Sequence, residues 1–265
     1  MFNLLRKTIY DKRVFIIGWS VGLAFFAFLM ILFFPAFKDS GLEQLMAALP
    51  PELKALKGLI GDVNALSTTS GYLAGQFFDI RMPMFISVFA VILAVGLSVK
   101  DEDDGYMRTL LALPLSRIKV LFGKLLAIVA ICVFTNLAMV AGLYLGAIAV
   151  NVSLDIMVVL NLSLVNLLLS VCMTALVYSI GLITGKRGIT MALGVIIGAG
   201  SFLLTTFVKS VDWLKPYENV SLFHYFPATD IVKNGISLMD IVVLSSVILV
   251  SIAVAVIFFR RRDVR

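Results

Sequence analysis

The chain has 265 residues, of which 61% are hydrophobic and only 14% are charged. A soluble domain carries about 25% charged residues, so this composition excludes an ordinary water-soluble fold. The charged residues gather in short clusters between long uncharged runs, which indicates a chain whose main solvent is lipid. The net charge of +6 does not indicate a nucleic-acid partner, because no basic arm and no basic stripe with interleaved aromatic residues is present.

The cysteine and histidine content of the sequence supports neither a metal site nor a disulfide. Cys132 and Cys172 both lie in apolar runs and supply neither a disulfide framework nor a four-ligand zinc site. We therefore expect free core cysteines and no metal site. His224 is the only histidine, which excludes a multi-histidine relay within one chain. It could sense pH or contact a substrate, although a hydrogen-bonded histidine at the membrane interface is the simpler interpretation.

Six uncharged runs are long enough to cross the hydrocarbon core, which needs about 20 apolar residues. The sequence therefore predicts an all-α integral membrane protein with six transmembrane helices, built as a single domain over residues 1–265. An amphipathic helix over residues 1–13 precedes the first span. The predicted spans are Val14–Phe34, Pro83–Val99, Leu125–Val150, Ile156–Ile183, Ile189–Val208 and Ile241–Phe259.

The orientation follows from the basic residues between the spans. With the N-terminus inside, 15 of the 22 lysines and arginines lie on the cytoplasmic side, as the positive-inside rule requires. An even number of spans then places the C-terminus in the cytoplasm as well. This orientation predicts extracytoplasmic loops over residues 37–82 and 209–237, and a cytoplasmic hairpin over residues 100–119.

The hairpin between spans two and three is the most informative segment. Acidic residues open it, as expected where a helix dipole favours negative charge. Tyr106, Leu110 and Leu113 then form an apolar stripe at helical spacing. Pro114 ends this helix, and Ser116 can cap the next one. From spacing alone, a helix that docks a partner and a solvated turn that fixes topology are equally good interpretations.

The same segment resembles a known family. Acidic residues, then Gly-Tyr-Met-Arg-Thr-Leu-Leu-Ala-Leu-Pro-Leu-Ser-Arg and Gly123-Lys124, resemble the first cytoplasmic loop of type-2 ABC-exporter permeases of bacteria and archaea. Tyr106 stands where threonine is commoner in that family. The resemblance covers the whole chain, including the Phe-His-Tyr-Phe-Pro sequence at residues 223–227. The most similar subgroups are permeases described as polyketide-antibiotic exporters or as serving multicopper-enzyme maturation.

The resemblance implies a half-transporter in the plasma membrane of a prokaryote. Two such subunits, as a homodimer or heterodimer, would pair with two copies of a separate ATP-binding-cassette ATPase, which would bind ATP and Mg. This chain would need no cofactor of its own. The Glu102–Leu113 helix would couple ATPase closure to the spans, driving export by alternating access. The residues implied in coupling are Glu102, Asp103, Gly105, Tyr106, Arg108, Thr109, Leu110, Leu111, Pro114, Ser116 and Arg117.

ATP hydrolysis by this chain is not expected. A phosphate-binding loop ends in Gly-Lys followed by serine or threonine, whereas Leu125 and Arg187 follow the two Gly-Lys pairs here. We therefore predict no catalytic residue. The alternatives are an ion-coupled carrier and a non-transporting sensor or assembly factor. No charged residue lies inside a predicted span, which disfavours the ion-coupled carrier.

Span four carries a stripe of uncharged polar residues within roughly a third of the helix circumference. Such a stripe could line a pathway for an amphipathic or hydrophobic substrate, or it could hold helices together. We favour the second role and keep the first as an alternative. The stripe consists of Ser163, Asn166, Ser170, Thr174 and Tyr178.

Three pairs of glycines at four-residue spacing predict close helix packing, because glycine lets two backbones approach. The pairs are Gly18 with Gly22, Gly142 with Gly146, and Gly194 with Gly198.

Overall fold

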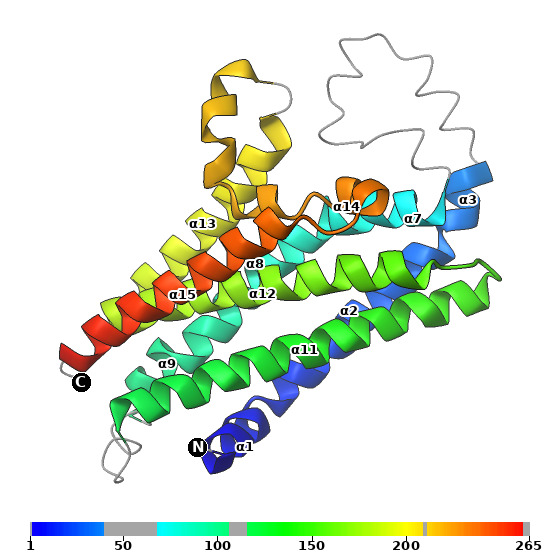
Figure 1. The fold of residues 1–265 in the computed structure, drawn as a ribbon. Helices are drawn as coiled ribbons and strands as arrows, with labels where there is room; N and C mark the ends of the chain where they lie inside the picture. Colours follow the sequence, from blue (N-terminus) through cyan, green and yellow to red (C-terminus); the bar gives the residue numbers. More distant parts are fainter. Residues whose placement is uncertain (1, 40–67, 106–115, 209–210, 262–265) are drawn as a thin grey trace.

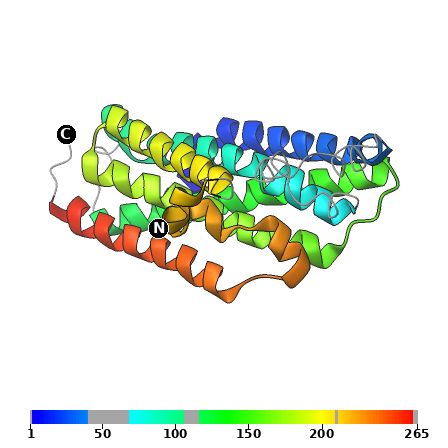
Figure 2. The same ribbon diagram turned by 90° about the horizontal axis from the view of Figure 1, so that it is seen from above.

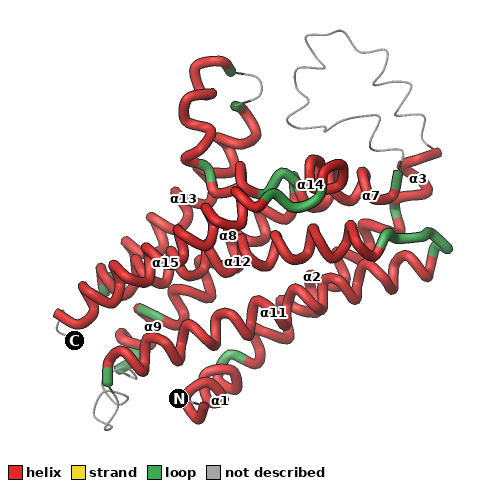
Figure 3. Tube along the Cα trace, viewed as in Figure 1, coloured by secondary structure: helices red, strands yellow, loops and turns green. Residues whose placement is uncertain are grey.

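A computed structural model describes residues 2–39, 68–105, 116–208 and 211–261. These residues form helices and short connections, with no strand among them (Figure 3). The predicted all-α fold is therefore confirmed. The described residues also contain six helices that are long and apolar enough to span a membrane. These spanning helices are α2 (Arg13–Leu32), α8 (Arg81–Leu97), α11 (Arg117–Ala149), α12 (Ile156–Thr184), α13 (Arg187–Phe207) and α15 (Leu238–Arg261).

Short helices connect the spans. The amphipathic helix α1 (Phe2–Asp11) precedes α2, and α3 (Phe34–Asp39) continues it. The others are α7 (Thr69–Tyr72), the π-helix η1 (Leu73–Phe78), α9 (Val99–Asp103), the 3₁₀ helices η2 (Asp212–Val220) and η3 (Leu222–Tyr225), and α14 (Ala228–Asn234).

The two ends of the helix bundle differ in what they hold. Helix α1, helix α9, the start of α11 and the C-terminal end of α15 lie at one end, which we name the hairpin end (Figure 1). Helices α3, α7 and α14 lie at the opposite end, which we name the α14 end (Figure 1). Both termini therefore lie at the same end of the bundle, as an even number of spans requires.

Helix α8 is the most buried of the six spans, and α13 and α15 are the least buried. Helix α12 packs against α8, α11, α13 and α15, while α2 packs mainly against α11. Seen from above, α2 and α15 lie along opposite edges of the bundle (Figure 2). The outward faces of α13 and α15 are apolar, as lipid contact or contact with another apolar helix requires.

The segment that leads into α8 is helical. Within the predicted extracytoplasmic loop over residues 37–82, residues 69–78 form helices and enter the hydrophobic core. Phe77 and Phe78 are completely buried. Burial also raises the pKa of the Tyr72 phenol, and the positive charge of Arg81 only partly opposes this shift. Tyr72 therefore stays neutral across the physiological pH range.

Two of the three glycine pairs pack as predicted. A Cβ atom on Gly142 or Gly146 would collide with the α2 backbone at Ala24 or Phe28. Gly194 and Gly198 lie in the same way against side chains of α8 and α12. The third pair, Gly18 and Gly22, has no atom of the described residues within 4 Å of the added Cβ positions and faces away from the other described helices.

We expect Gly142→Ala to destabilise the protein by about 1–3 kcal/mol, because the added methyl group pushes α2 away from α11. Thermal unfolding of the purified protein in mild detergent measures this loss. Gly22→Ala is the matched control, since its methyl group meets no neighbour. Equal melting temperatures for the two variants would contradict the close packing of α2 on α11.

Candidate functional site

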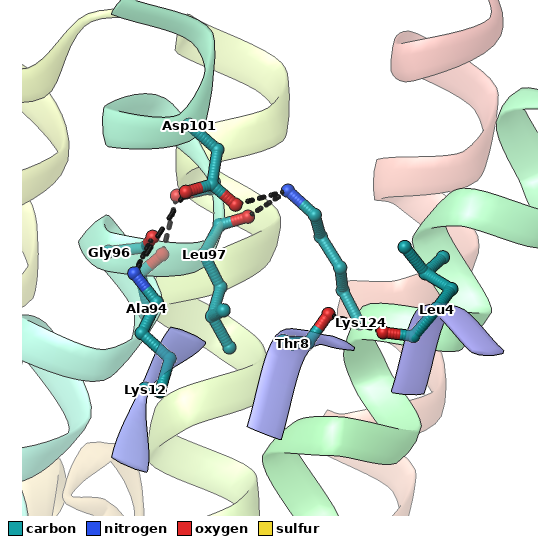
Figure 4. A network of polar contacts seen from close by, with 9 residues as sticks. Leu4, Thr8, Lys12, Ala94, Gly96, Leu97, Asp101 and Lys124 are labelled. Atoms are coloured by element: carbon teal, nitrogen blue, oxygen red, sulfur yellow. Dashed lines mark hydrogen bonds and ion pairs between the residues drawn. The ribbon is translucent and has the colours of Figure 1, made fainter. Parts of the chain in front are cut away.

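Two lysines converge on one aspartate at the hairpin end. Lys12 lies between α1 and α2, Asp101 lies in α9, and Lys124 lies on α11. The Nζ atom of Lys124 is 2.7 Å from Oδ2 of Asp101, and that of Lys12 is 3.9 Å from Oδ1 (Figure 4). The Lys124 side chain is only 1% exposed. We name these three residues the lysine–aspartate cluster; it joins three parts of the chain through one carboxylate.

Both lysines also bind the end of α8. Lys12 Nζ donates to the Gly96 carbonyl oxygen at 2.6 Å, and Lys124 Nζ donates to the Leu97 carbonyl oxygen at 2.8 Å (Figure 4). The last carbonyls of a helix lack intrahelical partners and carry its negative pole, so ammonium groups stabilise them. The two ammonium groups therefore offset the negative charge of Asp101 and stabilise the negative pole at the C-terminal end of α8.

The chain direction changes at Ser98, which separates α8 from α9. Its backbone angles, φ −103° and ψ −86°, lie outside the helical region, and its hydroxyl donates to the Ala94 carbonyl oxygen at 2.6 Å. Gly181 of α12 lies directly against Ser98, where a Cβ atom would collide with the serine side chain. The break in the helix is thus positioned by α12, and it turns Asp101 toward the two lysines.

Helix α1 is seated beside the same cluster. Leu4 is buried against Gly123 of α11, where an added Cβ would come within 2.7 Å of the leucine side chain. Thr8 is buried one turn later and donates its hydroxyl to the Leu4 carbonyl oxygen at 2.8 Å. The predicted amphipathic helix at the N-terminus is therefore part of the hairpin end, with Lys12 at its exit.

The described residues of the predicted coupling segment lie around this cluster. Glu102 is buried and Asp103 is exposed, both in α9. Ser116 caps α11 as predicted, accepting a hydrogen bond from the Lys119 backbone N–H at 3.3 Å. Arg117 Nη1 donates to the Phe259 carbonyl oxygen of α15 at 3.3 Å. Tyr106, Arg108, Thr109, Leu110, Leu111 and Pro114 lie outside the described residues.

The predicted start of the coupling helix is wrong. The sequence indicated one helix over Glu102–Leu113 with acidic residues in its first turn. Instead, Asp101, Glu102 and Asp103 end the short helix α9, and Gly105 has a φ of +72°, which a continuous α-helix does not allow. The acidic residues therefore belong to the extension of α8.

The sequence prediction also missed the roles of Lys12 and Lys124. Neither lysine was assigned a structural contact from the sequence, and Lys124 was placed outside span three. The signal that could have shown this is the cap at Ser116. Because the helix begins at Arg117, Lys124 lies two turns inside it, and a buried lysine there needs a counter-charge. The statement that no charged residue lies within a span is therefore corrected for Lys124.

The polar stripe of α12 lies in the protein interior. All five of its residues are buried. The Asn166 amide donates to Asn136 Oδ1 of α11 at 3.0 Å, whereas Ser170 and Thr174 each donate to a carbonyl oxygen one turn earlier in α12. The Asn166–Asn136 bond joins two helices, as the favoured role predicts. A role of the stripe as a substrate path stays a prediction.

An aspartate also organises the α14 end. Asp79 follows η1, and its carboxylate accepts a hydrogen bond from the Ala228 backbone N–H at 2.7 Å and from the Thr229 hydroxyl at 2.6 Å. It therefore caps α14 from a distant part of the chain.

The lone histidine has the hydrogen-bonding partner that the sequence predicted: His224 Nδ1 lies 3.2 Å from Glu218 Oε1. Within the described ranges, no three His, Cys, Asp or Glu side chains are grouped as metal ligands.

Comparison with known protein families finds one described as "ABC-2 family transporter protein", which matches residues 3–264. No curated protein matches the chain.

We expect Asp101→Asn to reduce the free energy of unfolding by about 3 kcal/mol, because it leaves the buried ammonium of Lys124 without its counter-charge. Denaturant unfolding in detergent measures the change. Asp103→Asn, an exposed neighbour in the same helix, is the control and should be nearly neutral. If both variants unfold alike, the lysine–aspartate cluster does not stabilise the hairpin end.

Proposed function

Because this chain belongs to the ABC-2 transporter family, we propose that it is the permease subunit of an ATP-driven exporter of amphipathic or hydrophobic molecules. Members of this family are membrane components that work with a separate ATP-binding subunit. The observation that carries the proposal is the lysine–aspartate cluster at the base of the segment between Gly105 and Ser116. This cluster ties α9, the helix that leads into that segment, to α1, α8 and α11 at once.

The cluster suits the transmission of movement. A partner that contacts the segment between Gly105 and Ser116 would act on α9 and on the first turn of α11. Asp101 holds α9 to Lys124, so the two flanking helices move together and do not separate. Arg117 extends this connection to the end of α15 through the Phe259 carbonyl oxygen. A rigid-body displacement of several spans is what alternating access requires.

The proposed substrate class rests on the character of the bundle interior. Toward its middle, the polar side chains of α12 are amides and hydroxyls, and the charged groups of the lysine–aspartate cluster stay near the hairpin end. A molecule with a large apolar part and a few hydrogen-bonding groups matches such surroundings better than an ion does. A second copy of the chain, facing the little-buried helices α13 and α15, would complete the transporter.

The buried Lys124–Asp101 pair also favours one rival, an ion-coupled carrier, because such carriers use ionisable groups within spans. However, Lys124 lies seven residues into α11, only about 10 Å along the helix axis from its start. Its ammonium is also already bound by a carboxylate and a carbonyl oxygen. These contacts suit a structural role better than ion release.

The docking part of the proposal is tested by co-purification. We expect the tagged chain, extracted in mild detergent, to bring with it a stoichiometric soluble subunit that has a phosphate-binding loop. Arg108→Asp combined with Leu110→Asp should abolish this association. Asn234→Asp combined with Leu238→Asp, which also introduces two aspartates but at the far end of the protein, is the control and should retain the partner. Full retention by the first variant would show that the segment does not dock the ATPase.

The energy source is tested separately. In proteoliposomes that contain the complex, transport of a fluorescent amphipathic dye should require ATP and should persist when an ionophore dissipates the proton gradient. Transport that runs without ATP and stops with the ionophore would replace the exporter by the ion-coupled carrier.

A further inference from the structure

A small cavity lies where α2, α8, α11 and α12 meet, away from the lysine–aspartate cluster. Its volume is about 20 Å³. Phe85 and Met82 form part of its apolar wall, and Cys132, Asn136, Asn166 and Ser170 also line it. A cavity must offer about 10–15 Å³ to hold one water molecule, so this one has room for a single water and not for a transported substrate.

One polar atom in this cavity lacks a protein partner. Asn166 is 2% exposed, and its amide nitrogen donates to Asn136 Oδ1 at 3.0 Å. Among the described residues, no group donates a hydrogen bond to Asn166 Oδ1. If both amides are turned over, the bond between them is preserved and the Asn166 nitrogen becomes the atom left over. In either orientation Asn166 keeps an unused hydrogen-bonding group at the cavity.

The two hydroxyl groups beside the cavity can act as acceptors. The Thr135 hydroxyl lines the cavity and donates its hydrogen to the Ile131 or Cys132 carbonyl oxygen, at 3.0 and 3.1 Å. The Ser170 hydroxyl donates to the Asn166 carbonyl oxygen at 2.8 Å. Both hydroxyl oxygens can therefore accept but not donate a further hydrogen bond. In the orientation that the structure shows, Asn166 Oδ1 and these two hydroxyl oxygens are all acceptors, and a molecule with two hydrogens can donate to two of them at once.

We propose that this cavity binds one water molecule, which donates hydrogen bonds to Asn166 Oδ1 and to a hydroxyl oxygen of Thr135 or Ser170. Water fits the cavity volume, supplies two donors and needs two to four polar partners, which this site offers. A lipid chain or an apolar substrate group would fill the space but leave the amide unsatisfied, and a buried unsatisfied amide is strongly unfavourable. The inference concerns a different site from the proposed ATPase coupling and does not depend on it.

The bound water changes how α11 and α12 are joined. The Asn136–Asn166 bond alone would be a single fixed contact between the two helices. With water beside it, the amides can exchange one hydrogen-bond partner for another without being exposed to lipid. The two spans can then shift slightly while their polar groups remain satisfied.

The two native cysteines provide the test. Cys132 lines the cavity, whereas Cys172 is equally buried in the core but does not line it. The full-length chain in lipid nanodiscs is transferred to D₂O, and the loss of each S–H stretching band is followed by infrared spectroscopy. Cys172→Ala and Cys132→Ala isolate the two bands. We expect the Cys132 thiol to exchange in a fast phase that the Cys172 thiol lacks, because bound water carries deuterium to it.

Two variants link the fast phase to the amide. Asn166→Leu removes the group that holds the water with little change in side-chain size, and we expect it to abolish the fast phase. Asn161→Leu, the same substitution on the same helix but outside the cavity, should preserve it. The proposal is overturned if Cys132 and Cys172 exchange alike in the native sequence background. It is also overturned if the fast phase survives Asn166→Leu. The comparison of the two cysteines decides the matter even if Asn166→Leu does not fold.

Discussion

The ammonium group of Lys124 is the constraint on which the hairpin end depends. Apolar surface gives little preference for one helix arrangement over another in lipid, because the lipid tails are as apolar as the helix faces. A buried ammonium group is different, since it is strongly unfavourable without a counter-charge and hydrogen-bond acceptors. Lys124 obtains them from Asp101 and the Leu97 carbonyl oxygen, which fixes α11 against the break between α8 and α9. Lys12 then adds the exit of α1 to the same carboxylate. One aspartate thereby sets the relative position of elements that are far apart in the sequence.

The sequence predicts the features that depend on local patterns. All six spans were recognisable as long uncharged runs, and Ser116 was recognisable as a cap because capping involves only the next three residues. The contact between Lys124 and Asp101 was not predictable in this way. It depends on a change of direction at Ser98, and no proline marks that position. The burial of Phe77 and Phe78 was also missed, because the segment is too short and too mixed in character to show a helical period. The glycine pairs were located correctly, but only the packed structure shows that Gly18 and Gly22 face away from the other described helices.

The polar groups inside the bundle differ in charge from one position along its length to another. Charged side chains form the lysine–aspartate cluster near the hairpin end, while the cavity between α2, α8, α11 and α12 is lined by amides and hydroxyls. This difference follows the penalty for burying each kind of group, which is greatest for a charge in the middle of a membrane. It also separates two tasks. The charges hold helices in a fixed arrangement, whereas neutral amides can exchange partners and permit small shifts.

Helix α8 has an aspartate beside each end, and each aspartate binds a different part of the chain. Asp79 precedes its first turn and caps α14, while Asp101 follows its last turn and binds two lysines. The 17 residues between Ile80 and Ser98 form one helix, about 26 Å long. Such a helix is stiff along its axis and enclosed by neighbouring helices, and polar contacts hold the chain at or beside each of its ends. Because Lys12 and Lys124 bind the Gly96 and Leu97 carbonyl oxygens, a displacement of that end of α8 would be carried along the helix axis toward Asp79 and α14.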